Sequence, residues 1–371
     1  MEKILIAEKI EFLYSGEKYS SCKSDIFTVE LKEKFVYRFE TGFAVCGKAR
    51  AEIFIAFKNN ENKELAKLHI ENGSVITTVL GTAYAEIQFW ASSEEKATVC
   101  FEDARLIPLH EEKKREVVLA AVAIKYTDAS RTLEKNIKEA IECIDNAAKE
   151  NPDLIVLTEH FYARDSGLPK EETALHLDGE IVKKFRDKAK EYNTYIAFSN
   201  YAFLENGNIS NLGVLIDRKG EIAGTYSKTH YTMGELLAGL EPGDGPRVFE
   251  CDFGKVGFAI CWDLFFPEFA RLYHLEGVDV IINPSAGFEA QRNSERAKET
   301  GAYIVSSGIH TLADSAIFAP DGEVLSYGDE KGYAAAKVDL NKEFYVDWLS
   351  ASSSSTRKNV FKYERVPELY K

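Results

Sequence analysis

The chain has 371 residues, of which 45% are apolar and 12% aromatic, and its formal net charge is −14. A chain of this length is expected to hold two domains, or one large domain with an extension, and it has enough apolar residues to bury a sizeable core. The acidic balance argues against a nucleic acid or an anionic membrane as partner.

The chain shows no targeting or membrane-spanning pattern. Its first 16 residues carry several Glu and Lys and lack the long apolar core of a signal peptide. No stretch approaches the roughly 18 consecutive apolar residues that a membrane span needs. The six cysteines are irregularly spaced without a Cys-x-x-Cys pair, which disfavours a disulfide framework and a zinc site. We therefore expect a cytoplasmic protein without a disulfide framework or a zinc site.

Residues 1–112 predict an all-β, sandwich-like domain. Short segments alternate apolar and polar residues, which is typical of strands with one buried face. Turn formers such as Asn72 and Gly73 separate them. The predicted strands are Ile26–Leu31, Phe35–Glu40, Ala51–Phe57, Lys67–Ile70, Ala85–Trp90 and Ala97–Phe101.

Residues 113–371 predict an α/β domain, because strands and helices alternate beyond the charged run at residues 111–115. Helices are expected over Ala129–Glu150, Lys183–Tyr192 and Ser294–Ala302. The predicted strands are Val117–Ala123, Asp153–Leu157, Tyr195–Phe198, Leu212–Ile216, Val256–Ile260, Val278–Asn283, Tyr303–Ser307 and Ser315–Ala319.

Three segments of this second domain place reactive side chains near strand ends. Glu159 follows the apolar run Asp153–Leu157, and ligands of open α/β sheets bind at the carboxyl ends of the strands. Lys228 follows a strand and a turn. Cys261 ends an apolar strand before a turn and a predicted helix, where a helix N-terminus favours the thiolate and offers N–H groups to an oxyanion. Taken singly, each residue has a commoner structural explanation, as a surface charge or a buried thiol.

Taken together and in this order, the three segments resemble the nitrilase, or carbon–nitrogen hydrolase, superfamily over about residues 116–371. Further matching segments are Pro242-Gly243, Asn283-Pro284-Ser285, Arg296-Ala297-Lys298-Glu299 and Ala319-Pro320-Asp321-Gly322. The resemblance implies an αββα sandwich, here preceded by the β domain. It also implies a Glu–Lys–Cys triad, a homo-oligomer, and chemistry that requires no metal or organic cofactor.

The resemblance assigns roles to these residues. Glu159 would be the general base, Cys261 the nucleophile that forms a thioester, and Lys228 the donor that holds the oxyanion together with the backbone N–H of Trp262. The family's second glutamate is matched better by Glu235 than by Glu241, which is expected to face solvent. The expected walls of the substrate pocket, with core packing as the alternative for about half of them, are His160, Phe161, Tyr162, Trp262 and Phe288.

The residues after the cysteine indicate the substrate class. The motif Cys261-Trp262-Asp263 resembles the motif of the amidase and carbamoyl-hydrolase branch, whereas nitrilases typically have Cys-Trp-Glu at this site. We therefore expect hydrolysis of a non-peptide C–N bond in a small amide or N-carbamoyl compound. The alternatives are a nitrilase or an N-acyltransferase of the same superfamily, or a carbohydrate-binding protein with a relic hydrolase domain.

The first domain is expected to have a structural or access-gating role. Its aromatic residues offer a possible glycan platform, but core packing is the commoner use of such rings. The residues in question are Tyr14, Tyr19, Phe43, Tyr84 and Trp90.

Overall fold

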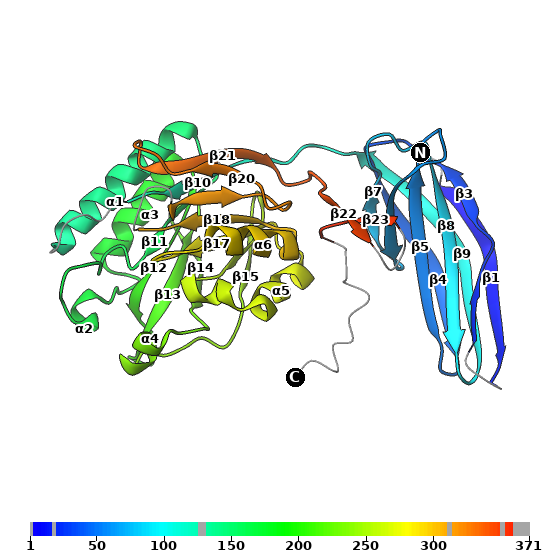
Figure 1. Ribbon diagram of the computed structural model, residues 1–371, viewed down its shortest axis with the longest axis horizontal. Coiled ribbons are helices and arrows are strands. Elements are labelled where there is room, and N and C mark those ends of the chain that lie inside the picture. The colour runs from blue at the N-terminus through cyan, green and yellow to red at the C-terminus, as the bar shows by residue number, and fades with distance from the viewer. Residues whose placement is uncertain (1–2, 17–19, 125–130, 310–313, 349–352, 359–371) are drawn as a thin grey trace. The chain divides into compact units, whose positions relative to one another are not determined.

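The computed structural model describes residues 3–16, 20–124, 131–309, 314–348 and 353–358 (Figure 1). The described residues form two compact units. One unit comprises the residues up to Lys113 together with those from Tyr345 onward, and the other comprises Lys114–Phe344. The domain bounds 1–112 and 113–371 stay predictions, but the predicted order of an all-β region followed by an α/β region is confirmed.

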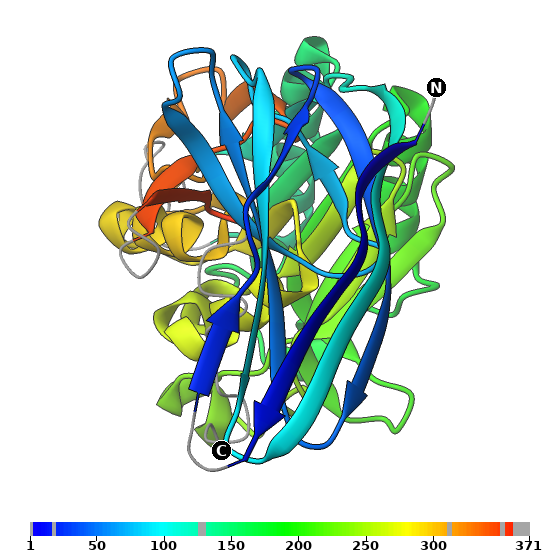
Figure 2. The same cartoon turned by 90° about the vertical axis from the view of Figure 1, so that its right-hand side faces the viewer.

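The first unit is a β-sandwich. One sheet has the strand order β1-β9-β4-β7, and Figure 2 shows β1 lying beside β9. The other has the order β2-β8-β5-β6, with β3 also paired to β8. The strands are β1 (Ile4–Ser15), β2 (Ser20–Lys23), β3 (Phe27–Glu30), β4 (Phe35–Cys46), β5 (Arg50–Lys58), β6 (Glu64–Ile70), β7 (Val75–Thr77), β8 (Tyr84–Ser93) and β9 (Lys96–Glu111). The pair β22 (Tyr345–Trp348) and β23 (Ser353–Thr356) belongs to the same unit.

Alternation of side chains builds the core of this sandwich. Every second residue of β8 is buried, and Phe89 on β8 contacts Phe39 on β4 and Phe101 on β9 of the other sheet, with ring centroids 6.5 and 4.9 Å apart. Tyr14 is buried in this core, as the core-packing alternative predicted, whereas Phe43 is 53% exposed. Tyr19 lies outside the described residues.

The second unit consists of two six-stranded sheets. The first has the order β14-β13-β12-β11-β10-β21 and the second the order β15-β16-β17-β18-β19-β20. Strands of the first are β10 (Glu116–Val122), β11 (Leu154–Glu159), β12 (Tyr195–Phe203), β13 (Ile209–Ile216), β14 (Ile222–Ser227) and β21 (Tyr333–Asp339). Strands of the second are β15 (Val248–Cys251), β16 (Gly254–Phe258), β17 (Val280–Pro284), β18 (Tyr303–Ser307), β19 (Ala316–Phe318) and β20 (Val324–Tyr327).

Helices cover the outer face of each sheet, which confirms the αββα arrangement (Figure 1). On β10, Leu119 and Ala121 face the core between the sheets, while Ala120 and Val122 face the core beneath α1 and α3. The helical elements are α1 (Leu133–Ala147), η1 (Ala148–Glu150), α2 (Lys170–Thr173), α3 (Glu180–Tyr192), α4 (Met233–Leu237), η2 (Cys261–Phe265), α5 (Pro267–Glu276) and α6 (Ala290–Thr300).

Each predicted strand overlaps an observed one, and the three helices predicted with bounds are found as α1, α3 and α6. Among the described residues the first of these begins at Leu133, where the Thr132 side chain caps its N-terminus by accepting from Lys135 N–H. The predicted start at residue 129 lies outside the described residues. None of the helices in the described part of the chain has the length and apolarity that crossing a bilayer requires.

Candidate active site

Glu159 is the last residue of β11, at the carboxyl end of a strand that pairs in parallel with both of its neighbours. Its side chain is almost completely buried. Oε1 accepts hydrogen bonds from Lys228 Nζ at 2.9 Å and from Asn211 Nδ2 at 2.8 Å, and Oε2 accepts from the backbone N–H of Ala286 at 2.9 Å. A buried carboxylate is tolerated here because both of its oxygens are hydrogen-bonded.

Lys228 follows the end of β14 and is 1% exposed. Its Nζ lies between two carboxylates, at 2.9 Å from Glu159 Oε1 and at 2.8 and 3.0 Å from the two oxygens of Glu235. The sequence predicted these three residues as members of one site, and the structure brings them together.

Glu235 lies on the short helix α4, which the motif Thr232-x-x-Glu235 begins. Thr232 Oγ1 accepts from the Glu235 N–H, and Glu235 Oε2 in turn accepts from the Thr232 N–H at 2.9 Å, which is a capping box. The same carboxylate therefore caps the helix and holds Lys228. Glu241, the alternative, instead accepts from the side chains of Asn206 and Asn208 and takes no part in this cluster.

Cys261 begins η2, directly after the extended residue Ile260; the preceding strand β16 ends at Phe258, two residues earlier than predicted. Its φ is +44°, which is a strained backbone conformation for a residue with a side chain. Sγ lies 3.9 Å from the carbonyl oxygen of Gly287. A helix was predicted after this turn, and the structure has the 3₁₀ turn η2 followed by α5 with Pro267 at its first position.

Asp263 joins the cysteine turn to the segment that carries Lys228. Its carboxylate is fully buried and accepts from the backbone N–H groups of Ile260 and His230, at 2.9 and 2.8 Å. The Tyr226 hydroxyl also donates to it at 2.8 Å. Because one carboxylate holds both segments, it fixes the position of Cys261 relative to the residues around Lys228.

The charges of the cluster set the protonation states at rest. Burial alone would raise the pKa of Glu159, but Lys228, His160 and the hydrogen bonds from Lys228 and Asn211 lower this pKa to about 2. Burial opposes the charge of Lys228, yet Glu159, Cys261 and Glu235 raise its pKa above the usual value. Burial and the charge of Glu159 raise the pKa of Cys261 to about 11, against the opposing effect of Lys228. The resting site therefore holds a carboxylate, an ammonium and a neutral thiol.

Asn211 belongs to the site although its role was not predicted from the sequence. Its Nδ2 lies 2.8 Å from Glu159 Oε1, 3.2 Å from Glu235 Oε1 and 3.3 Å from His160 Nε2. The side chain is completely buried on β13, which begins at Ile209, earlier than predicted. A polar residue inside an apolar strand was the signal that could have identified it.

The predicted pocket walls take different positions. His160 lies beside the cluster, with Nε2 3.8 Å from Glu159 Oε1 and its ring against Tyr201. Trp262 follows the cysteine and stacks on Phe265 with ring centroids 4.1 Å apart. Phe288 follows Gly287, and its ring packs edge-on against Phe318. Contact of these rings with a substrate stays a prediction.

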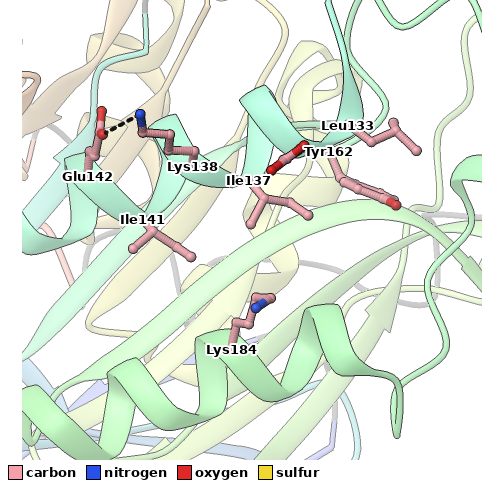
Figure 3. A pocket seen from close by; sticks show the side chains of 8 residues that line it. Leu133, Ile137, Lys138, Ile141, Glu142, Tyr162 and Lys184 are labelled. Carbon is pink, nitrogen blue, oxygen red and sulfur yellow. Dashed lines mark ion pairs between the residues drawn. The ribbon is translucent and has the colours of Figure 1, made fainter.

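The structure places two of the predicted walls elsewhere. Phe161 is fully buried against Phe185 on α3 and Phe198 on β12, in the core beneath the helices. Tyr162 lines a separate groove of about 550 Å³ along α1 and α3 (Figure 3). That groove is lined by Leu133, Glu134, Ile137, Lys138, Ile141, Glu142, Tyr162 and Lys184. The chain turns at His160, where φ is +55°, and the residues after it therefore leave the site.

The cluster also contains a possible set of metal ligands. Glu159, His160 and Glu235 each offer one ligand atom, all within 4.8 Å of one another. However, the Lys228 ammonium already lies within 3.0 Å of both carboxylates. One of their two negative charges is therefore already balanced by a side chain, and the arrangement favours an ion-paired network over a metal centre.

Comparisons with known proteins bear on the family and the fold of the chain. Residues 118–343 match the family described as carbon-nitrogen hydrolase. A nitrilase of Pyrococcus abyssi is 34% identical over 227 residues, which cover 56% of this chain and 84% of the relative. An N-carbamoylputrescine amidase of Arabidopsis thaliana is 26% identical over 300 residues, or 70% of this chain and 96% of the relative. A variant of the amidase from Nesterenkonia sp. AN1, with the acetamide moiety of fluoroacetamide added at its active site cysteine, has a TM-score of 0.52 at 20% identity, covering 60% of this chain and 91% of its own.

Proposed function

Since the chain belongs to the carbon–nitrogen hydrolase family, we propose that it hydrolyses a small amide or N-carbamoyl compound through a thioester on Cys261. The observation that carries the proposal is the buried Lys228, which Glu159 and Glu235 hold at 2.8–3.0 Å and whose positive charge acts to lower the pKa of the Cys261 thiol. Such a cluster is costly to bury, and its position at strand ends is where α/β sheets bind ligands. Perturbed ionisable groups of this kind gather at functional sites.

In the first half of the reaction, Glu159 takes the proton of the Cys261 thiol, and the sulfur attacks the carbonyl carbon. The carbonyl π electrons move to the oxygen, and Lys228 stabilises the resulting oxyanion together with the Trp262 N–H. The protonated Glu159 then gives its proton to the leaving nitrogen. The C–N bond breaks, ammonia or an amine departs, and the acyl group stays on sulfur as a thioester.

In the second half, Glu159 accepts a proton from a water molecule, whose oxygen attacks the thioester carbonyl carbon. The same donors stabilise the second oxyanion. When the C–S bond breaks, the proton on Glu159 returns to the Cys261 sulfur, and the acid product leaves. The low pKa of Glu159 keeps it ionised at neutral pH, so that it is ready to act as base at the start of each half-reaction.

We propose amides over nitriles because this chain has Asp263 at the position where nitrilases have a glutamate. The nitrilase of Pyrococcus abyssi among the relatives makes nitriles the second candidate. The two substrate classes differ in the first product, since an amide gives a thioester directly whereas a nitrile first gives a thioimidate.

The test is a screen of ammonia release from small amides, N-carbamoyl compounds and the nitriles matched to those amides. We expect turnover of at least one amide or N-carbamoyl compound by the full chain. Turnover that persists in Cys261→Ala would contradict the mechanism, and faster turnover of a nitrile than of its matched amide would contradict the substrate class.

A further inference from the structure

In the resting site, the Lys228 ammonium makes as many contacts with carboxylate oxygens as it has N–H groups. An ammonium has three donors and no acceptor. Lys228 Nζ makes one contact to Glu159, at 2.9 Å, and two to Glu235, at 2.8 and 3.0 Å. To stabilise an oxyanion in the proposed reaction, Lys228 must therefore turn one N–H away from a carboxylate.

Each carboxylate oxygen that Lys228 contacts has a second donor, and these second donors carry no charge. Glu159 Oε1 and Glu235 Oε1 both accept from Asn211 Nδ2, at 2.8 and 3.2 Å. Glu235 Oε2 accepts from the N–H and the hydroxyl of Thr232, at 2.9 and 3.0 Å. When Lys228 releases one of these oxygens, the oxygen therefore keeps a hydrogen bond, and the desolvation penalty of an unpaired buried charge is avoided.

We propose that Asn211 is a positioning residue, whose carboxamide holds Glu159 and Glu235 in place while Lys228 turns an N–H toward the oxyanion. The inference rests on the proposed function and assigns to Asn211 no contact with the substrate. A neutral donor suits the task, because it adds no charge that would compete with Lys228 for the oxyanion.

The environment of Asn211 supports this role. Its backbone N–H donates to the Tyr231 hydroxyl at 3.0 Å, and its carbonyl oxygen accepts from the Lys228 N–H at 2.9 Å. Nδ2 donates to Glu159 and Glu235 and lies 3.3 Å from His160 Nε2, whereas Oδ1 is buried without a hydrogen-bond partner among the described residues. The side chain thus leaves its own acceptor unpaired, and the carboxylates set the orientation of the amide.

The test compares two reactions of Cys261 in the full chain, one that forms an oxyanion and one that does not. With p-nitrophenyl acetate, the sulfur attacks the carbonyl carbon through a tetrahedral oxyanion, the C–O bond breaks, and p-nitrophenolate leaves with the electron pair. With iodoacetamide, the sulfur displaces iodide from the methylene carbon, and no oxyanion forms. The cysteine proton goes to Glu159 in both reactions, so the ratio of the two rates isolates support of the oxyanion.

For Asn211→Ala we expect acylation of Cys261 to slow by about 10- to 100-fold, the rate equivalent of one hydrogen bond to a charged group. Alkylation should slow much less. The acid limb of the acylation rate should also move to higher pH, because the Asn211 hydrogen bond contributes to the low pKa of Glu159. A loss of stability alone would change neither the ratio of the acylation rate to the alkylation rate nor the pH at which acylation falls off on the acid side.

Asn200→Ala is the matched control. Asn200 is buried on the neighbouring strand β12, but its amide donates to the backbone oxygens of Thr173 and Tyr201, both at 3.0 Å. Its loss should lower the melting temperature and leave the ratio of rates at the wild-type value. If Asn211→Ala does not fold, Thr232→Val removes one second donor of Glu235 and should change the ratio in the same direction.

Equal slowing of both reactions in Asn211→Ala, or no slowing of either, would overturn the inference. The inference would also be overturned if Asn200→Ala changed the ratio as strongly. A wild-type protein whose Cys261 is not acylated at all would instead overturn the proposed function, so the two failures can be distinguished by mass analysis of the acylated residue.

Discussion

Replacing Glu235 by glutamine tests the second carboxylate that holds Lys228. The two Glu235 oxygens accept from Lys228, Thr232 and Asn211, and all of these partners are donors. Glutamine keeps one acceptor and turns an NH₂ group toward donors. It also removes one of the two negative charges that hold the buried Lys228.

The expected loss follows from these contacts. A hydrogen bond to a charged group contributes about 1.5–3 kcal/mol, which corresponds to a change in rate of about 10- to 150-fold. Because at least one such bond is lost and Lys228 loses its fixed position, we expect kcat to fall by about 100-fold or more, on the scale of a lost catalytic group. The assay is ammonia release from the best amide of the screen, with kcat and KM measured separately and the melting temperature recorded.

Glu241→Gln is the matched control on the same segment. Glu241 accepts from Asn206 and Asn208 at the surface, and it contacts none of Glu159, Lys228 and Cys261 in the described structure. Its replacement should leave kcat nearly unchanged. Near-normal turnover of Glu235→Gln, or an equal loss in Glu241→Gln, would refute the role given to Glu235.

Three further predictions concern the nucleophile, the base and the substrate. Cys261→Ala should abolish hydrolysis without a change in melting temperature, and intact-mass analysis of the wild type with a slow substrate should find the acyl adduct on Cys261, not on another cysteine. Glu159→Gln should abolish hydrolysis. It should also move the pH profile of Cys261 alkylation by iodoacetamide to lower pH, because the charge of Glu159 is one cause of the raised thiol pKa. A pH profile that stays in place or moves to higher pH would count against this electrostatic coupling. The wild type should turn over amides or ureido compounds faster than matched nitriles, measured by ammonia release, and the opposite order would show that Asp263 does not mark the substrate class.

The sequence by itself determined which side chains lie at strand ends. The apolar residues before Glu159 and before Cys261 are enough to predict two buried strands. A carboxylate or thiol that follows such a strand lies at the carboxyl end of that strand. The β-sandwich was predicted for the same reason, because alternation along each strand depends on the period of the backbone alone. Strand β21 was missed because its Ala-rich sequence has no such alternation, and its pairing with β10 comes from the tertiary fold.

The tertiary structure decided which of the neighbouring side chains enter the site. Glu159 and His160 lie in the cluster whereas Phe161 lies in the core, because the backbone takes a positive φ at His160 that no residue pattern indicated. Asn211 joins the site because β13 pairs with β12 and β12 pairs with β11, so that the Asn211 side chain reaches Glu159, 52 residues earlier in the chain. Contacts of this kind depend on strand pairing and on the direction of each turn, which are long-range properties of the folded chain, whereas strand ends are local properties of the sequence.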